Sequence, residues 1–202
     1  MVGLFSNLTG EKYMTVAIRM DTYKAVHKAL RFLMFKISIN IAKYDVKYDV
    51  GFGHIKSDFD ELSAWLKEHG AHEDNFFHGF LRKKHPATLA ALDYQHEQAE
   101  IDWRDVEDEA VRIFESSQKA DATQWHRFYL KFNHFLTSYL THLQYEELVA
   151  LPLLWESATD EELMIAVQNM LKAFTPQAVE RSKKWLLLSC NLSELKQMRY
   201  VP

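Results

Sequence analysis

Two histidine–glutamate pairs are the residues best suited to chemistry in this sequence. His69 precedes Glu73 by four positions, and His142 precedes Glu146 by the same spacing. On an α-helix, residues at this spacing project about 40° apart on one face. Apolar residues on both sides of His69 continue that face, so the pair is predicted to point into a core. Because burying polar groups without partners costs roughly 2–7 kcal/mol, a metal ion shared with other helices would explain the pattern.

Two further segments each place one histidine in an apolar stripe. His27 lies in a stripe that runs from Tyr23 to Ile41, and His96 lies in one that runs from Leu89 to Ile113. The separation from His27 to the first pair is similar to the separation from His96 to the second pair. The chain therefore looks like one helical hairpin used twice. Folded as a bundle, the two hairpins would bring four histidines and two carboxylates to one level.

The helical periodicity predicts an all-α protein with an up-down-up-down four-helix bundle. The helices are expected to start near Asp21, Ser57, Pro86 and Thr123, and the last is expected to kink or end near Pro152. The bundle would occupy residues 21–157, after a lead-in of uncertain structure at 1–20. A capping-box pattern at 159–162 and a Thr-Pro pair at 175–176 predict further helices. We expect this extension, residues 158–202, to pack on the bundle, because it is too short for an independent domain.

Composition narrows the class of protein. The chain has 202 residues, 48% hydrophobic and 26% charged, which is typical of a soluble globular protein. A net charge of −4 gives no electrostatic case for nucleic acid as a partner. The single cysteine, Cys190, excludes an internal disulfide and a cysteine-rich metal site. No apolar run approaches the roughly 20 residues that span a bilayer, and no secretion signal is apparent. A cytoplasmic protein without a membrane partner is expected.

Carboxylates that can bridge, with imidazoles on either side, suit a pair of iron or manganese ions. Glu100 lies one turn after His96 and could complete the shell of one ion. The candidate metal ligands are therefore His27, His69, Glu73, His96, Glu100, His142 and Glu146.

These residues resemble those of the hemerythrin-like, HHE cation-binding family over about residues 20–155. The resemblance rests on His27-Lys-Ala-Leu-Arg31, His69-xxx-Glu73, His96, and His142-xxx-Glu146-Glu147 with Pro152. It implies a non-heme di-iron centre inside the bundle, with manganese or zinc as possible substitutes. By this resemblance His27 and His69 would bind one iron, and His96 and His142 the other. Glu73 and Glu146 would bridge the two ions.

One position departs from the family pattern. Hemerythrins that carry oxygen have a second histidine one turn after the third-helix ligand, and here that position is Glu100. A carboxylate in place of an imidazole makes a site harder and more anionic, which favours oxidised ions. Alternatively, Glu100 could form an ion pair with Arg31, which lies one turn beyond His27. Reversible oxygen carriage is therefore not the expected function.

Some other acidic and histidine residues are alternative candidate ligands, and the rest are not expected to bind metal. Glu147 competes with Glu146, but it projects roughly 140° from His142 rather than 40°. His72 lies at the edge of the stripe and could be a ligand. His78 projects opposite His69 and is expected to be solvated. The remaining histidines are expected at the surface or hydrogen-bonded: His54, His85, His126 and His134.

Three functions from different classes fit this pattern. The first is a di-iron binding protein for oxygen or nitric oxide sensing, redox sensing or iron handling. The second is a di-iron enzyme that uses oxygen or peroxide. The third is a metal-free helical interaction module, which is disfavoured because its buried histidines and glutamates would lack partners. A small diatomic ligand is the expected partner, and the sequence leaves monomer and homodimer equally open.

Overall fold

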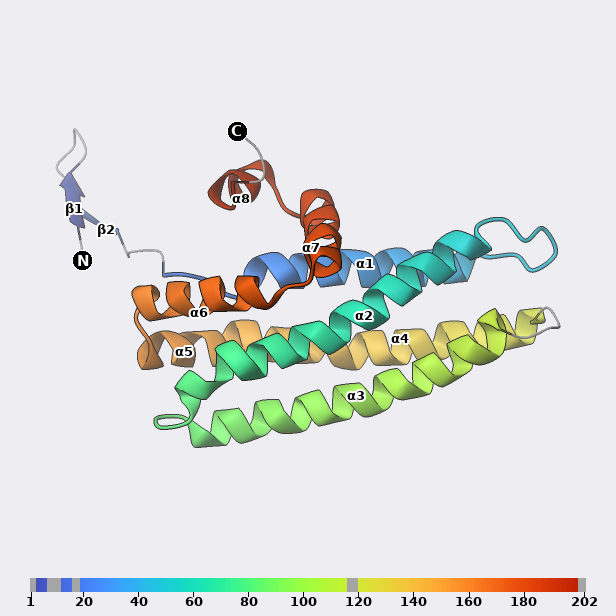
Figure 1. The fold of residues 1–202 in the computed structure, drawn as a ribbon, viewed down its shortest axis with the longest axis horizontal. Helices are drawn as coiled ribbons and strands as arrows, with labels where there is room; N and C mark the ends of the chain where they lie inside the picture. Colours follow the sequence, from blue (N-terminus) through green and yellow to red (C-terminus); the bar gives the residue numbers. More distant parts are fainter. Residues whose placement is uncertain (1–2, 7–11, 16–18, 116–119, 200–202) are drawn as a thin grey trace.

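Four long helices lie side by side and alternate in direction (Figure 1). The computed structural model describes residues 3–6, 12–15, 19–115 and 120–199. The four helices are α1 (Lys24–Lys43), α2 (Phe52–Phe76), α3 (Pro86–Phe114) and α4 (Ala122–Tyr145). The prediction of an all-α four-helix bundle is confirmed.

Shorter elements join and extend the bundle. A 3₁₀ helix follows α2, and a π-helical turn joins α4 to a continuing helix that contains Pro152. They are η1 (His78–Leu81), η2 (Glu146–Ala150), α5 (Leu151–Ser157), α6 (Asp160–Ala173), α7 (Pro176–Ser189) and α8 (Leu192–Gln197). Before the bundle, β1 (Gly3–Ser6) pairs antiparallel with β2 (Lys12–Thr15), with Gly3 opposite Thr15. This hairpin lies in the lead-in whose structure the sequence left uncertain.

Helix starts follow the capping residues. The predicted capping box of α6 is present, because Thr159 accepts from the Glu162 amide and Glu162 accepts from the Thr159 amide. At the start of α1, the Asp21 carboxylate accepts from the amides of Tyr23 and Lys24. The predicted start of α2 was wrong by five residues. Gly51, with φ at 95°, ends the preceding turn, so the helix begins at Phe52.

Two apolar clusters fill the bundle and leave a polar layer between them. The larger cluster includes Leu30, Leu62, Trp103 and Phe132, and the smaller one includes Phe77, Leu81, Leu92, Ala150 and Leu154. On every long helix, the histidines of the predicted site lie between residues of these two clusters. The sequence stripes therefore bury those histidines at one level of the bundle. Both clusters surround the layer with apolar side chains, which lowers the local dielectric.

The C-terminal helices lie against the outside of α1 and α2 (Figure 1). Trp185 of α7 is fully buried, and its indole N–H donates to Glu61 Oε2 over 2.7 Å. Glu194 of α8 forms ion pairs with Lys24 and Lys28 on α1. Among the described residues, no helix combines the length and apolar character needed to cross a membrane.

Candidate metal centre

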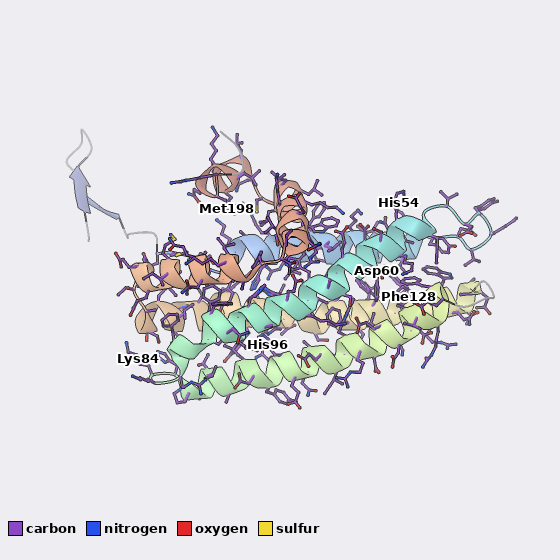
Figure 2. The ribbon with its side chains drawn as sticks, in the orientation of Figure 1. His54, Asp60, Lys84, His96, Phe128 and Met198 are labelled. Carbon is purple, nitrogen blue, oxygen red and sulfur yellow. The ribbon has the colours of Figure 1, made fainter. Side chains whose placement is uncertain are left out.

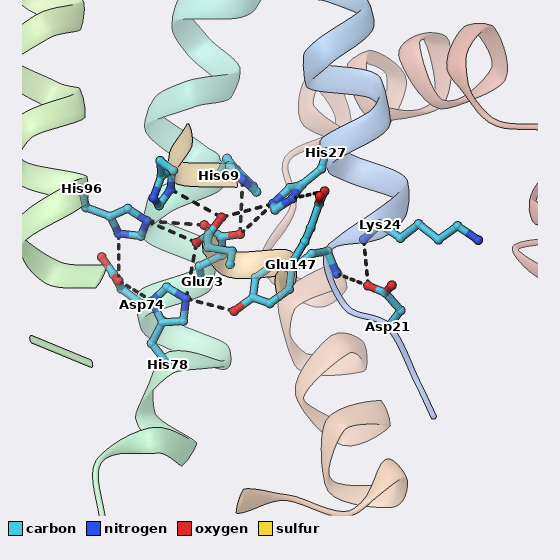
Figure 3. Close-up of polar contacts among 12 residues, drawn as sticks. Asp21, Lys24, His27, His69, Glu73, Asp74, His78, His96 and Glu147 are labelled. Atoms are coloured by element: carbon cyan, nitrogen blue, oxygen red, sulfur yellow. Dashed lines mark hydrogen bonds and ion pairs between the residues drawn. The ribbon is translucent and has the colours of Figure 1, made fainter. Parts of the chain in front are cut away.

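Six of the seven candidate ligands meet inside the bundle. They form two groups, and in each the ligand atoms lie within 4.8 Å of one another; a third such group joins His96 to Asp74 and His78. The first group is His27, His69, Glu73 and Glu146, and the second is Glu73, His96, His142 and Glu146. Both carboxylates belong to both groups. Figure 3 shows how His27 approaches from α1, His69 and Glu73 from α2, and His96 from α3.

The inward atoms of these groups are close together but not hydrogen-bonded. His69 Nε2 lies 3.2 Å from Glu73 Oε1, and His27 Nε2 lies 3.3 Å from Glu146 Oε2. His96 Nε2 lies 3.6 Å from Glu73 Oε2. One Nε2 of each histidine and both oxygens of each glutamate, eight atoms in all, have no hydrogen-bond partner among the described residues.

Such a set of unpaired buried atoms fits a pair of metal ions. A divalent metal holds imidazole and carboxylate ligands at about 2.0–2.2 Å, so two ligands of one ion lie roughly 3 Å apart. The separations between inward atoms, from 3.2 to 3.6 Å, are close to this value. Eight buried polar atoms without partners would otherwise be costly. The donor set therefore matches a metal centre better than a closed hydrogen-bond network.

In three of these histidines, the Nδ1 atom, which points away from the centre, contacts a side-chain oxygen that orients the ring. His27 Nδ1 lies 2.9 Å from Glu147 Oε1, and His96 Nδ1 lies 3.1 Å from Asp74 Oδ1. His142 Nδ1 lies 3.0 Å from Gln95 Oε1. Each of these oxygens accepts from Nδ1, so in the neutral form of each ring the lone pair lies on Nε2, which faces the centre. Metal-binding histidines in proteins are oriented in this way.

Arg31 fixes the carboxylate behind His27. Its two terminal nitrogens contact the two oxygens of Glu147 over 2.5 and 3.0 Å. Although burial raises the pKa of Glu147, His27 and Arg31 outweigh it and lower that pKa to about 2. Glu147 thus remains ionised where it contacts Nδ1 of the candidate ligand His27. Of the two rival carboxylates, Glu146 is the one that lies within the groups.

The histidines compensate the charge of the two inner glutamates. Burial lowers the pKa of His96, but Asp74, Glu146 and Glu73 outweigh it and raise that pKa to about 12. Burial also lowers the pKa of His27, but Glu146, Glu147 and Glu73 outweigh it and leave that pKa well above its usual range. Burial lowers the pKa of His69 to about 4. These raised pKa values favour protonated His27 and His96 beside the two carboxylates, and a bound metal would replace those protons.

Comparison with known families agrees with this arrangement. The Hemerythrin HHE cation binding domain matches residues 19–154. The chain belongs to this family. Among curated proteins and among solved structures, no significant match was found. Residues of this hemerythrin-like domain can thus hold a cation.

The π-helical turn of the hemerythrin-like domain begins at the candidate ligand Glu146. The Leu151 amide donates to the carbonyl of Glu146, five residues earlier, and Pro152 follows without an amide proton. A π turn accommodates an extra residue, and such turns often occur at functional sites. Here it allows the chain to continue past Pro152 while Glu146 stays fully buried.

His78 is the residue that the sequence interpretation placed wrongly. It was expected to be solvated, but it is 1% exposed. Its Nδ1 lies 3.1 Å from Asp74 Oδ1, and its Nε2 lies 3.7 Å from Glu146 Oε1. The error arose because α2 ends at Phe76 and a 3₁₀ helix follows, so a steady 100° per residue no longer applies. No periodic signal in the sequence marks this change.

Glu100 is the candidate ligand that the structure does not bring into the hemerythrin-like centre. Its side chain is exposed and lies in the wall of a cavity of about 380 Å³ beside His96. The suggested partner Arg31 binds Glu147 instead.

The other histidines also lie outside both groups. His72 is half-buried and stacks on Phe174, with ring centroids 4.8 Å apart. His54, His126 and His134 are exposed, and His85 is half-buried near Glu156.

Proposed function

We propose that this hemerythrin-like domain binds two iron ions and serves as a sensor of oxygen, nitric oxide or redox state, or in iron handling. The observation that carries the proposal is the set of eight unpaired, buried imidazole and carboxylate atoms in two overlapping groups. A bound iron pair would supply one-electron chemistry and a binding position for a diatomic ligand. The protein residues determine where the ions lie and what reaches them.

Each residue has a defined role in this proposal. His27 and His69 would hold one ion, and His96 and His142 the other. Glu73 and Glu146 would serve both ions, because both belong to both groups. Imidazole with carboxylate suits iron, and also zinc and manganese. Glu147, Asp74 and Gln95 would keep the rings in the binding orientation.

The cavity beside His96 supports access of a small molecule to one side of the centre. Besides His96 and Asp74, its wall includes the aromatic side chains Trp103, Phe135 and Tyr139. Tyr139 is buried, and its ring centroid lies 5.4 Å from that of His142. The aromatic wall would limit water while an apolar diatomic molecule enters.

The same cavity favours one second candidate function, a di-iron enzyme. A volume of about 380 Å³ exceeds what a diatomic molecule needs, and small-molecule pockets begin at about 300 Å³. An organic substrate could therefore lie next to His96, between α2, α3 and α4. A sensor would respond once per centre, whereas an enzyme would consume oxygen or peroxide repeatedly when its substrate is present.

The experiment is a metal analysis followed by an anaerobic titration. Protein purified without added metal, and apo protein loaded with ferrous iron, are analysed for iron, zinc and manganese. We expect two iron ions per chain and a change in visible absorption when oxygen or nitric oxide is added. His54→Ala is the matched control, because His54 is exposed and lies far along the bundle from His96 (Figure 2). Less than one ion per chain under all conditions would contradict the proposal and favour a metal-free module.

A further inference from the structure

His78 is buried beside the centre and has no role in the proposed ligand set. We propose that His78 is a fifth histidine ligand, binding the ion that His96 and His142 hold. This inference rests on the proposed metal-binding function and specifies its ligand set.

The first observation that supports ligation by His78 is its position relative to one oxygen of Glu146. Its Nε2 lies 3.7 Å from Glu146 Oε1, and His96 Nε2 lies 3.6 Å from the same oxygen. The two imidazole rings are stacked, with centroids 5.4 Å apart and planes inclined by 29° (Figure 3). The Nε2 atoms of His78 and His96 therefore lie at nearly the same distance from one oxygen of Glu146, a carboxylate proposed to serve this ion.

A second observation that supports ligation by His78 is that one carboxylate, Asp74, contacts both imidazole rings. Asp74 Oδ1 lies 3.1 Å from Nδ1 of His78 and 3.1 Å from Nδ1 of His96. Because this oxygen accepts from Nδ1, the Nε2 of a neutral His78 is free to use its lone pair. This is the tautomer that a metal-binding histidine needs. One carboxylate thus prepares both imidazoles in the same way.

The present partner of His78 Nε2 does not prevent ligation. That nitrogen lies 3.2 Å from the hydroxyl of Tyr23, which is long for a hydrogen bond with an O–H donor. Tyr23 also stacks on His27, with ring centroids 5.2 Å apart. The rival explanation is that His78 only anchors Tyr23. The two explanations differ in what happens when the tyrosine hydroxyl is removed.

A fifth histidine would make the two ions unequal. Helix α3 supplies only His96, because the next turn carries the exposed Glu100. His78 would add an imidazole to this ion from η1. One ion would then have five protein ligands and the other four. Exogenous ligands would accordingly favour the ion held by His27 and His69.

The test uses cobalt(II) as a paramagnetic probe of the wild-type protein and three variants. His78→Asn keeps an amide that can donate to Asp74 but does not reach the Nε2 position. Tyr23→Phe removes only the hydroxyl, and His54→Ala is the control for loss of an unrelated imidazole. Proton NMR counts the shifted imidazole N–H signals, and chelator competition gives the two cobalt affinities.

We expect His78→Asn to lose one shifted N–H signal and to bind the second cobalt ion at least tenfold more weakly. Tyr23→Phe and His54→Ala should keep the wild-type signals and affinities. The inference is overturned if His78→Asn matches the wild type, or if Tyr23→Phe reproduces its loss. If the wild-type protein binds no pair of cobalt ions, the proposed function itself fails.

A second measurement needs no variant. Wild-type protein labelled with ¹⁵N-histidine and loaded with zinc should show five imidazoles with metal-shifted nitrogen resonances. Four shifted imidazoles would overturn the inference even if His78→Asn did not fold, and would leave the metal site of the proposed function intact.

Discussion

Glu73 and Glu146 come from different helices, and each belongs to both groups of candidate metal ligands. They are 3% and 0% exposed, and none of their four oxygens has a hydrogen-bond partner among the described residues. Burial raises the pKa of both carboxyls, and Glu73 further raises that of Glu146, yet the surrounding histidines hold both pKa values below the usual range. Positive charge at this level is thus a requirement of the fold as well as of any chemistry.

Metal binding should therefore stabilise the folded state. A ligand bound only by the native protein adds about 2.7 kcal/mol at a hundred times its Kd. We expect iron or cobalt to raise the melting temperature of the wild-type protein. Glu146→Gln should remove most of that rise, because it changes a ligand of both ions.

The matched control for this prediction is Glu109→Gln. Glu109 is also buried, at 2% exposed, but it pairs with Arg112 and lies outside both groups. Its substitution should lower the melting temperature with and without metal while leaving the metal-induced rise unchanged. Equal metal-induced rises in the two variants would argue against the bridging role of Glu146.

The Arg31–Glu147 pair should tune metal affinity without supplying a ligand. Arg31→Met removes the bidentate partner that holds Glu147 against His27. Loss of such outer-shell support costs about 10–100-fold in metal affinity. We expect a loss of this size for the ion at His27 and a smaller loss for the other ion. Chelator competition measures both, and unchanged affinities would show that Arg31 only stabilises the helix packing.

Most of the candidate ligands at this centre could be predicted from the sequence. Helical periodicity on four segments sufficed to select His27, His69, His96 and His142, because each lies on a core face between two apolar clusters. Spacing also favoured Glu146 over Glu147, and the structure places Glu146 within the groups. Position along a regular helix thus predicts which way a side chain points.

Where the helix is irregular, the same reasoning failed. His78 follows the end of α2, so its direction depends on the 3₁₀ turn of η1 and not on helical phase. The π-helical turn at Glu146–Ala150 likewise has no periodic signature. Glu100 is one turn from His96, yet it lies in the wall of the cavity. Only tertiary packing distinguishes a ligand position from a cavity position one turn away.

This position of Glu100 gives a direct test of its predicted role as a ligand. In the structure its side chain is exposed and outside both groups. We therefore expect Glu100→Ala to keep two ions per chain and to change their affinities less than twofold. Titration with cobalt measures both quantities. A tenfold loss would mean that Glu100 moves inward when metal binds and that the sequence interpretation was correct.

The cavity beside His96 should control how fast small molecules reach the centre. A Cβ atom at Gly70 would lie 3.8 Å from His96 Nδ1, an ordinary contact, so a longer side chain can extend into the cavity. Gly70→Leu should leave the iron content unchanged and slow the reaction of reduced protein with oxygen several-fold.

Stopped-flow absorption measures this rate, and Gly53→Leu is the control. Gly53 is also on α2, and a Cβ there meets nothing within 4 Å. Gly70→Leu also removes a glycine from the interior of α2, which by itself adds stability. Equal oxidation rates for the wild type and Gly70→Leu would show that access does not pass through this cavity.

The docking of α8 on α1 should depend on pH through Glu194. Lys28 and then Lys24 lower the pKa of this carboxyl to about 2, from an ordinary value of 4.5. A carboxyl with a depressed pKa in the folded state stabilises it fully above pH 4.5, and loses this contribution as pH falls through about 2. We expect NMR signals of α8 amides to show release of the helix between these pH values, before the signals of α1 change. Glu194→Gln should release α8 even at pH 7, whereas Glu180→Gln, at an exposed position on α7, should behave as the wild type. If α8 of Glu194→Gln stays docked at pH 7, the two lysine contacts do not hold it, and apolar contacts such as those of the buried Leu195 must do so.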